Sequence, residues 1–203
     1  MFFYIITIGM ILAVLALLFF EGLWASTITL MNLWFTSMIA LNYYEPLATF
    51  IDENMKLFES QPNYTEYVVF WLLFSGLFGV LRVFSRTISK YRVTANKPVE
   101  IIGSLLVATT ASCLFTSIVL TSFHFGPTEP SPLGGDLIRA EKVGENVSFK
   151  PGLEWYALSL YGHTTNNAFL PFFHNAEETE YYSTTKFMRA KMARRIEWYK
   201  NTK

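Results

Sequence analysis

The chain has 203 residues, of which only 16% are charged, whereas a soluble domain usually carries about 25% charged residues. With 52% hydrophobic residues, this composition excludes an ordinary soluble domain and points to a protein in lipid. The net charge of zero indicates nothing about partners, because no Lys or Arg precedes Lys56 while residues 186–203 are strongly basic. The single cysteine, Cys113, excludes a disulfide or a thiolate metal cluster within one chain.

The first hydrophobic segment runs from Phe2 to Phe20 and contains no charge. A helix needs about 20 predominantly apolar residues to cross the hydrocarbon core of a bilayer. The segment lacks the cationic start and the small-residue cleavage site of a secretion signal, so we expect it to be a retained transmembrane helix. Glu21 is the first charged residue.

The second hydrophobic segment runs from about Leu23 to Tyr44. Proline disfavours helical geometry in the residue before it and cannot donate a backbone hydrogen bond, so we expect this helix to end at Glu45 and Pro46. From Leu47 to Glu59, apolar and acidic residues alternate at helical spacing. This pattern fits a short helix on the membrane surface, and equally an ordinary loop.

Two further hydrophobic segments run from about Tyr67 to Phe84 and from about Val99 to Phe123. A connector from Arg82 to Lys97 separates them and is rich in basic residues. The last segment begins with Pro98 and Glu100 in its first turn. The missing amide of a proline is harmless there, and a carboxylate is stabilised by the positive end of the helix dipole. The sequence therefore predicts an all-α integral membrane protein with four transmembrane helices, followed by a small, partly helical extramembrane C-terminal tail.

The basic connector also predicts an orientation, because short loops rich in Lys and Arg stay in the cytoplasm. The Arg82 to Lys97 connector is then cytoplasmic, and so is the turn at Glu21 and Gly22. The N-terminus, the acidic Asp52 to Glu66 loop and the whole tail are expected on the outer side.

Three domains are expected: a four-helix transmembrane domain (1–123), a linker rich in Pro and Gly (124–152) and an extramembrane tail (153–203). Short helices are predicted at Leu153 to Tyr161 and Thr184 to Tyr199. The second of these is cationic and suits docking on a partner or on anionic lipid, or is a solvated face of a small tail domain. The residues for docking are Met188, Arg189, Met192, Arg194, Arg195, Ile196 and Tyr199.

Small residues recur at four-residue spacing in the last two hydrophobic segments. Small side chains let helix backbones approach closely, and hydroxyl groups can form hydrogen bonds between helices. Tight helix packing is the favoured interpretation, and a wet pathway through the membrane is the alternative. The helix-packing candidates are Ser75, Gly79, Gly103, Ser104, Ala108, Ser112 and Thr116.

Ionisable residues in these segments lie at the predicted cytoplasmic boundary and not in mid-span, where they would indicate an ion pathway. The shared depth of Glu21 with Arg82 and Arg86 predicts a structural ion pair.

The sequence offers no catalytic, cofactor-binding or metal candidates. The three histidines, His124, His163 and His174, are too far apart for a local ligand motif. No Gly-x-Ser-x-Gly elbow or Gly-rich phosphate loop occurs. We expect no enzyme, no cofactor and no nucleic-acid partner.

The order of these features resembles the colicin V production protein (CvpA) family of bacterial inner-membrane proteins, over about residues 1–123. The motifs are Glu21-Gly22-Leu23-Trp24, Asn42-Tyr43-Tyr44-Glu45-Pro46-Leu47-Ala48, Leu81-Arg82-Val83-Phe84 and Pro98-Val99-Glu100-Ile101-Ile102-Gly103. The tail resembles that of longer, planctomycete-type members, through Leu153-Glu154-Trp155 and Met192-Ala193-Arg194-Arg195. The chain differs in having Glu21 where the family often has Arg and Glu100 where it often has Asp.

The resemblance implies a multi-pass protein of the bacterial inner membrane, linked to toxin secretion and envelope maintenance, with no agreed molecular activity. The chain is predicted to be a non-enzymatic scaffold or accessory subunit in a homo-oligomer or a larger membrane complex. Membrane lipid is its other expected partner. The alternative is a small channel or export component, with the Ser and Thr face of the last hydrophobic segment as its pore lining.

Overall fold

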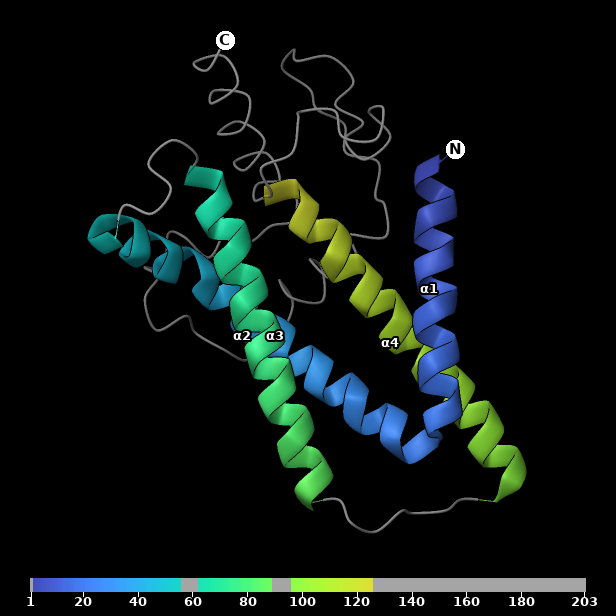
Figure 1. The fold of residues 1–203 in the computed structure, drawn as a ribbon. Helices are drawn as coiled ribbons and strands as arrows, with labels where there is room; N and C mark the ends of the chain where they lie inside the picture. The colour runs from blue at the N-terminus through green and yellow to red at the C-terminus, as the bar shows by residue number, and fades with distance from the viewer. Residues whose placement is uncertain (1, 56–61, 89–95, 126–203) are drawn as a thin grey trace, which may run out of the picture.

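A computed structural model describes residues 2–55, 62–88 and 96–125, and these form four helices (Figure 1). The helices are α1 (Phe2–Glu21), α2 (Leu23–Met55), α3 (Pro62–Ile88) and α4 (Lys97–Phe125). The prediction of an all-helical chain is therefore confirmed for the described residues. Three helical stretches are long and apolar enough to cross a membrane: Leu23–Asn54, Tyr64–Ile88 and Lys97–Phe123. This composition is compatible with a multi-pass membrane protein.

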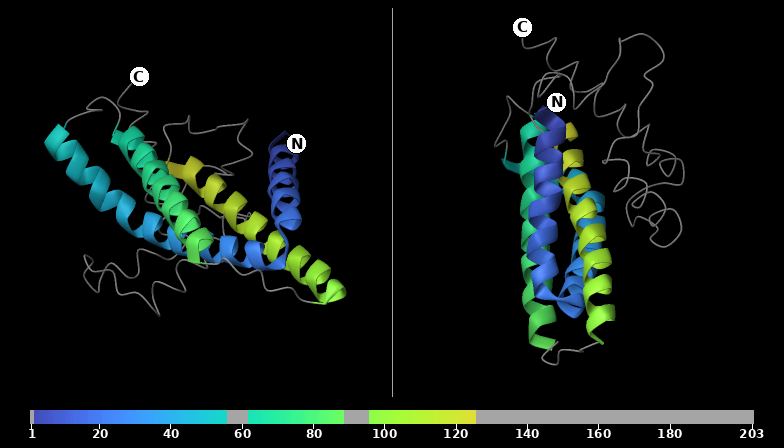
Figure 2. Two further views of the ribbon diagram at one scale, coloured as in Figure 1. Left: turned by 60° about the horizontal axis from the view of Figure 1, so that its bottom comes forward. Right: turned by 90° about the vertical axis from the view of Figure 1, so that its right-hand side faces the viewer.

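The helices form an open array. α4 packs against α1 and α2, and α2 in turn packs against α3. α1 and α3 lie apart from each other, and α2 and α4 connect them (Figures 1 and 2). Because α3 packs mainly on α2, most of its surface has no neighbour within the described part of the chain.

The predicted end of the second helix at Pro46 is wrong, because α2 continues through Pro46 to Met55. Tertiary contacts hold the helix together beyond the proline. Ala48 is buried, Ile51 packs on the hydrophobic core, and the Oγ1 of Thr65 in α3 donates a hydrogen bond of 2.8 Å to Oδ1 of Asp52. The 33 residues of α2 extend about 50 Å, which exceeds the bilayer core of about 30 Å.

The interior of the array is rich in polar residues. One apolar cluster is built around Tyr44, Phe70 and Phe74, whose rings lie edge-on or stacked. Among the described residues, the buried polar side chains are Thr7, Ser26, Thr29, Asn32, Thr36, Ser37, Thr65, Ser104, Ser112, Thr116, Ser117, Thr121 and Ser122. Several of these hydroxyl groups donate to a carbonyl of their own helix, as Ser112 does to Ala108 and Thr121 does to Ser117. Such bonds satisfy the hydroxyl without water.

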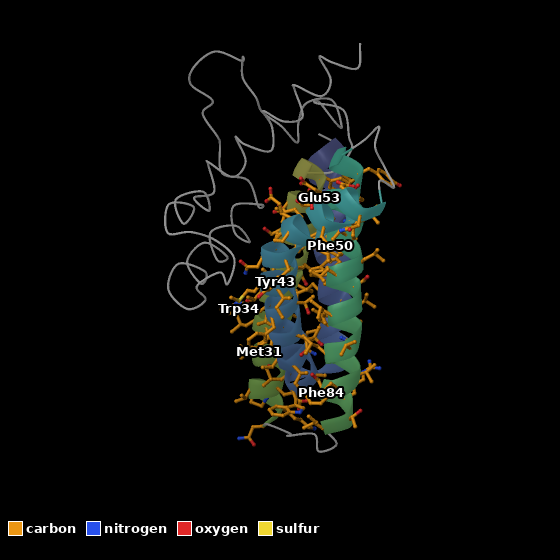
Figure 3. The ribbon with its side chains drawn as sticks, turned by 90° about the vertical axis from the view of Figure 1, so that its left-hand side faces the viewer. Met31, Trp34, Tyr43, Phe50, Glu53 and Phe84 are labelled. Atoms are coloured by element: carbon orange, nitrogen blue, oxygen red, sulfur yellow. The ribbon has the colours of Figure 1, made fainter. Side chains whose placement is uncertain are left out.

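The exterior is apolar. Phe20 is 84% exposed, and Leu17 and Val83 are also largely exposed. Figure 3 shows Met31, Tyr43 and Phe50 along α2 and Phe84 on α3, all of them exposed. An apolar surface around an interior with polar residues is the arrangement expected of helices in lipid. Apolar side chains can face lipid tails without a free-energy penalty.

The turn between α1 and α2 consists of one residue, Gly22, whose φ of 87° is in the left-handed region. Glycine adopts this conformation without the steric penalty of a Cβ. The last carbonyls of α1 accept hydrogen bonds at the turn. Ser26 Oγ donates to the carbonyl of Leu18 (2.6 Å), while the Gly22 N–H and Ser104 Oγ both donate to that of Phe19 (each 3.3 Å). The turn therefore leaves little unpaired backbone at the membrane boundary.

Replacing Gly22 with Ala should destabilise the chain by about 1 to 2 kcal/mol, because a Cβ disfavours the left-handed region. The measurement is the free energy of unfolding of the detergent-solubilised chain. The matched control is Gly9→Ala on α1, where an added Cβ meets nothing within 4 Å. That control should be neutral or stabilising by about 0.5 to 1 kcal/mol. Equal effects of the two substitutions would contradict this account of the turn.

Candidate functional site

A polar pocket lies between the start of α2 and the end of α3, next to the last residue of α1. Its volume is about 250 Å³. Its lining residues are Glu21, Trp24, Ala25, Ile28, Thr29, Asn32, Arg82, Ser85 and Arg86. The residues from α2 recur at three- or four-residue spacing and so share one face of that helix. The pocket residues lie where α1 and α3 end and α2 begins, and the start of α4 lies at the same end of the array (Figure 1).

An ion pair joins two helices across this pocket. Nη2 of Arg82 lies 2.5 Å from Oε1 of Glu21, and Nη1 of Arg82 donates to Oγ1 of Thr29 at 3.0 Å. The side chains of Arg82 and Glu21 are 27% and 32% exposed, so the pair is only partly shielded from solvent. The structure thus brings together two of the three residues that the sequence predicted to pair. Arg82 also ties the end of α3 to both α1 and α2, although α1 and α3 do not pack together.

The third residue of that prediction, Arg86, lies one helical turn further along α3. It lines the same pocket and is exposed. Within the described ranges, Arg86 has no ion-pair partner, since the Glu21 carboxylate engages Arg82. Because Glu21 neutralises Arg82, Arg86 gives the pocket an excess positive charge.

Asn32 is a pocket residue that the sequence reading missed. It is only 7% exposed, its Oδ1 accepts a hydrogen bond of 3.1 Å from Oγ of Ser85, and its Nδ2 is buried without a partner in the described structure. A buried amide N–H without a partner costs free energy, so its presence calls for a ligand or water. The available signal was an amide in an apolar segment at helical spacing from Glu21, Ala25 and Thr29.

Most of the predicted packing residues lie where helices meet. Ser104, Ala108, Ser112 and Thr116 form a buried column on α4. A Cβ at Gly103 would lie 3.0 Å from Cδ1 of Leu23, so glycine at this position allows close approach of α4 and the start of α2.

Ser75 and Gly79 do not pack in this way within the chain. Both are exposed on α3, and a Cβ added at Gly79 would meet nothing within 4 Å. These two residues do not pack against another helix of the described bundle, so their role in helix packing stays a prediction. The physical reason is that α3 contacts its neighbour α2 through the opposite, aromatic side, with Phe70 and Phe74.

The remaining predicted residues fall outside the described ranges. These are the docking residues Met188, Arg189, Met192, Arg194, Arg195, Ile196 and Tyr199, residues 126–152 of the predicted linker and the tail 153–203. Residues 124 and 125, predicted to begin the linker, are the end of α4. In residues 2–55, 62–88 and 96–125, no three His, Cys, Asp or Glu side chains lie together as a metal site would require.

No family model, curated protein or solved structure matches the chain. The resemblance to the CvpA family therefore stays a prediction. Among the described residues, the polar pocket is the feature best suited to bind a ligand, because charged groups and hydrogen-bond donors line it.

Replacing Glu21 with Gln should lower the free energy of unfolding in detergent by about 0.5 to 1 kcal/mol, because a partly exposed ion pair contributes little more. Arg82→Gln and the double variant complete a mutant cycle, whose coupling energy isolates the pair from the other contacts of Arg82.

The matched control is Glu53→Gln, which removes the same charge from an exposed position near the far end of α2. It should leave the stability unchanged. A coupling energy of zero between Glu21 and Arg82 would show that the pair contributes nothing to the fold.

Proposed function

We propose that the chain is a non-enzymatic membrane scaffold or accessory subunit that acts by packing its helices against a second copy or another membrane protein. The observation that carries this proposal is the outer face of α3, which is apolar, rich in small residues and without a neighbour in the described structure. The residues of this face are Leu72, Ser75, Gly76, Gly79, Val80 and Val83.

The α3 outer face has the properties of a helix-packing surface in lipid. Ser75 and Gly79 are four residues apart, which is the small-xxx-small spacing that lets two helix backbones approach closely. A Cβ added at Gly76 or Gly79 would meet nothing within 4 Å, so no side chain of the described structure fills the space above them. The hydroxyl of Ser75 donates to the carbonyl of Trp71 at 2.7 Å, so it is satisfied in an apolar environment.

The proposal includes α1 as a fourth transmembrane helix. Its 20 residues extend about 30 Å, which matches the hydrocarbon core, and only Glu21 at its end is charged. It packs along α4, and Leu18 contributes to a small buried cluster with Ala108 and Ala111. The last turn of α1 then lies at the membrane boundary with the ion pair.

We further propose that the protein is of the CvpA type and lies in a bacterial inner membrane, with both termini on the periplasmic side. Supporting features are the single-glycine turn after Glu21, the arginine near the end of α3 and the acidic first turn of α4. Under this proposal the assembly takes part in toxin secretion or envelope maintenance as a structural component.

Replacing Gly79 with Leu should dissociate the assembly, because a large side chain prevents close approach on the α3 outer face. The molecular mass of the particle purified in mild detergent is the readout, and the variant should shift to the mass of the single chain. Wild-type protein should give a larger mass, from a second copy or a different partner chain.

The matched control is Gly9→Leu on α1, where an added Cβ also meets nothing within 4 Å. It should leave the mass of the assembly unchanged. A wild-type protein that purifies as a single chain without a partner would overturn the scaffold proposal.

A further inference from the structure

The polar pocket has more hydrogen-bond donors and more positive charge than its own residues use. Glu21 and Arg82 neutralise each other, while Arg86 is exposed on the pocket lining and has no acidic partner in the described residues. The buried Nδ2 of Asn32 has no acceptor either. The occupant that fits is therefore an anion that accepts hydrogen bonds.

A hydrogen bond occupies one end of the Asn32 amide. Oγ of Ser85 donates to its Oδ1 at 3.1 Å, which leaves Nδ2 as the free end of a side chain that is 93% buried and lines the pocket. Arg82 is held in place by Glu21 and Thr29. The donors are thus arranged before any ligand binds, which lowers the entropic cost of binding.

We propose that this pocket binds the phosphate group of an anionic phospholipid, from the leaflet that borders the α3–α4 connector. Arginine and amide N–H groups are well suited to phosphate oxygens, and basic pockets between transmembrane helices on the cytoplasmic side bind anionic headgroups. The volume of about 250 Å³ leaves room for a phosphate group.

The surroundings favour a lipid over free phosphate. Met31 and Phe84 directly precede the pocket residues Asn32 and Ser85, and their side chains are 49% and 61% exposed (Figure 3). Trp24, which also lines the pocket, is 39% exposed, and tryptophan prefers the membrane interface. A ligand with an anionic head and apolar chains satisfies both parts of this surface.

This inference goes beyond the scaffold proposal. It requires only that the chain lies in a bilayer, and it does not depend on whether α3 packs against another helix. Failure of the Gly79→Leu experiment and failure of lipid binding are therefore separate results.

The test uses the full chain in nanodiscs of phosphatidylcholine, with phosphatidylglycerol titrated as the anionic lipid. The thermal unfolding temperature and the lipid retained by the protein in native mass measurements are recorded. Wild-type protein should bind phosphatidylglycerol saturably and unfold at a higher temperature. Arg86→Gln should weaken this binding roughly fivefold to tenfold, because one cation at the membrane surface is lost.

Lys97→Gln is the matched control, since it removes a positive charge from an exposed residue at the same end of the array but outside the pocket. It should bind phosphatidylglycerol as wild type does. A second variant, Asn32→Asp, keeps the shape of the side chain and replaces its free donor with a carboxylate oxygen. It should weaken binding at least as much as Arg86→Gln, while unfolding in phosphatidylcholine alone confirms that it is folded.

Three results would overturn the proposal. Arg86→Gln that binds phosphatidylglycerol as tightly as wild type would exclude this pocket. Equal losses in Arg86→Gln and Lys97→Gln would show that the attraction is a diffuse surface effect. Full stabilisation by inorganic phosphate in phosphatidylcholine nanodiscs would show that the phosphate source is soluble and not a lipid.

Discussion

The structure depends on one constraint: a polar group surrounded by hydrocarbon must find its partner inside the protein, because lipid offers none. Most buried hydroxyl groups of the described helices meet this constraint, while Oγ1 of Thr36 and of Thr116 has no partner in the described structure. Ser112 and Thr121 donate to carbonyls of their own helix, and Ser26 and Ser104 donate to carbonyls in the last turn of α1. The interior therefore holds many small polar residues, while large apolar side chains face outward.

The same constraint explains why Glu21, Arg82 and Arg86 lie near the ends of α1 and α3. Glu21, Arg82 and Arg86 all line a pocket beside the turn between α1 and α2, and the Glu21–Arg82 pair links helices that do not pack together. The open array of helices leaves this pocket accessible and leaves the α3 outer face without a neighbour. Lipid headgroups and other membrane helices are the partners that such surfaces suit in a bilayer.

The approximate positions of the four described helices could be predicted from the sequence, because an apolar stretch of about 20 residues without charge is a strong local signal. The pairing of Glu21 and Arg82 followed from their shared depth. The continuation of α2 through Pro46 could not be predicted, because it depends on contacts such as Thr65 with Asp52 that lie 13 residues apart. Asn32 was missed because its contact with Ser85 joins residues that are far apart in the sequence. The sequence also does not show that Gly79 lies on the side of α3 that faces away from α2.

The most direct measurement of the central claim is the labelling of two matched single-cysteine variants, Asn54→Cys and Asn96→Cys, in a Cys113→Ser background in intact cells. Both asparagines are exposed, and α3 lies between them in the chain. If α3 crosses the membrane with the basic connector inside, a membrane-impermeant maleimide labels the cysteine at position 54 and reaches position 96 only after the membrane is opened. Equal labelling of both positions in intact cells would contradict a transmembrane α3, and labelling of position 96 alone would contradict the orientation.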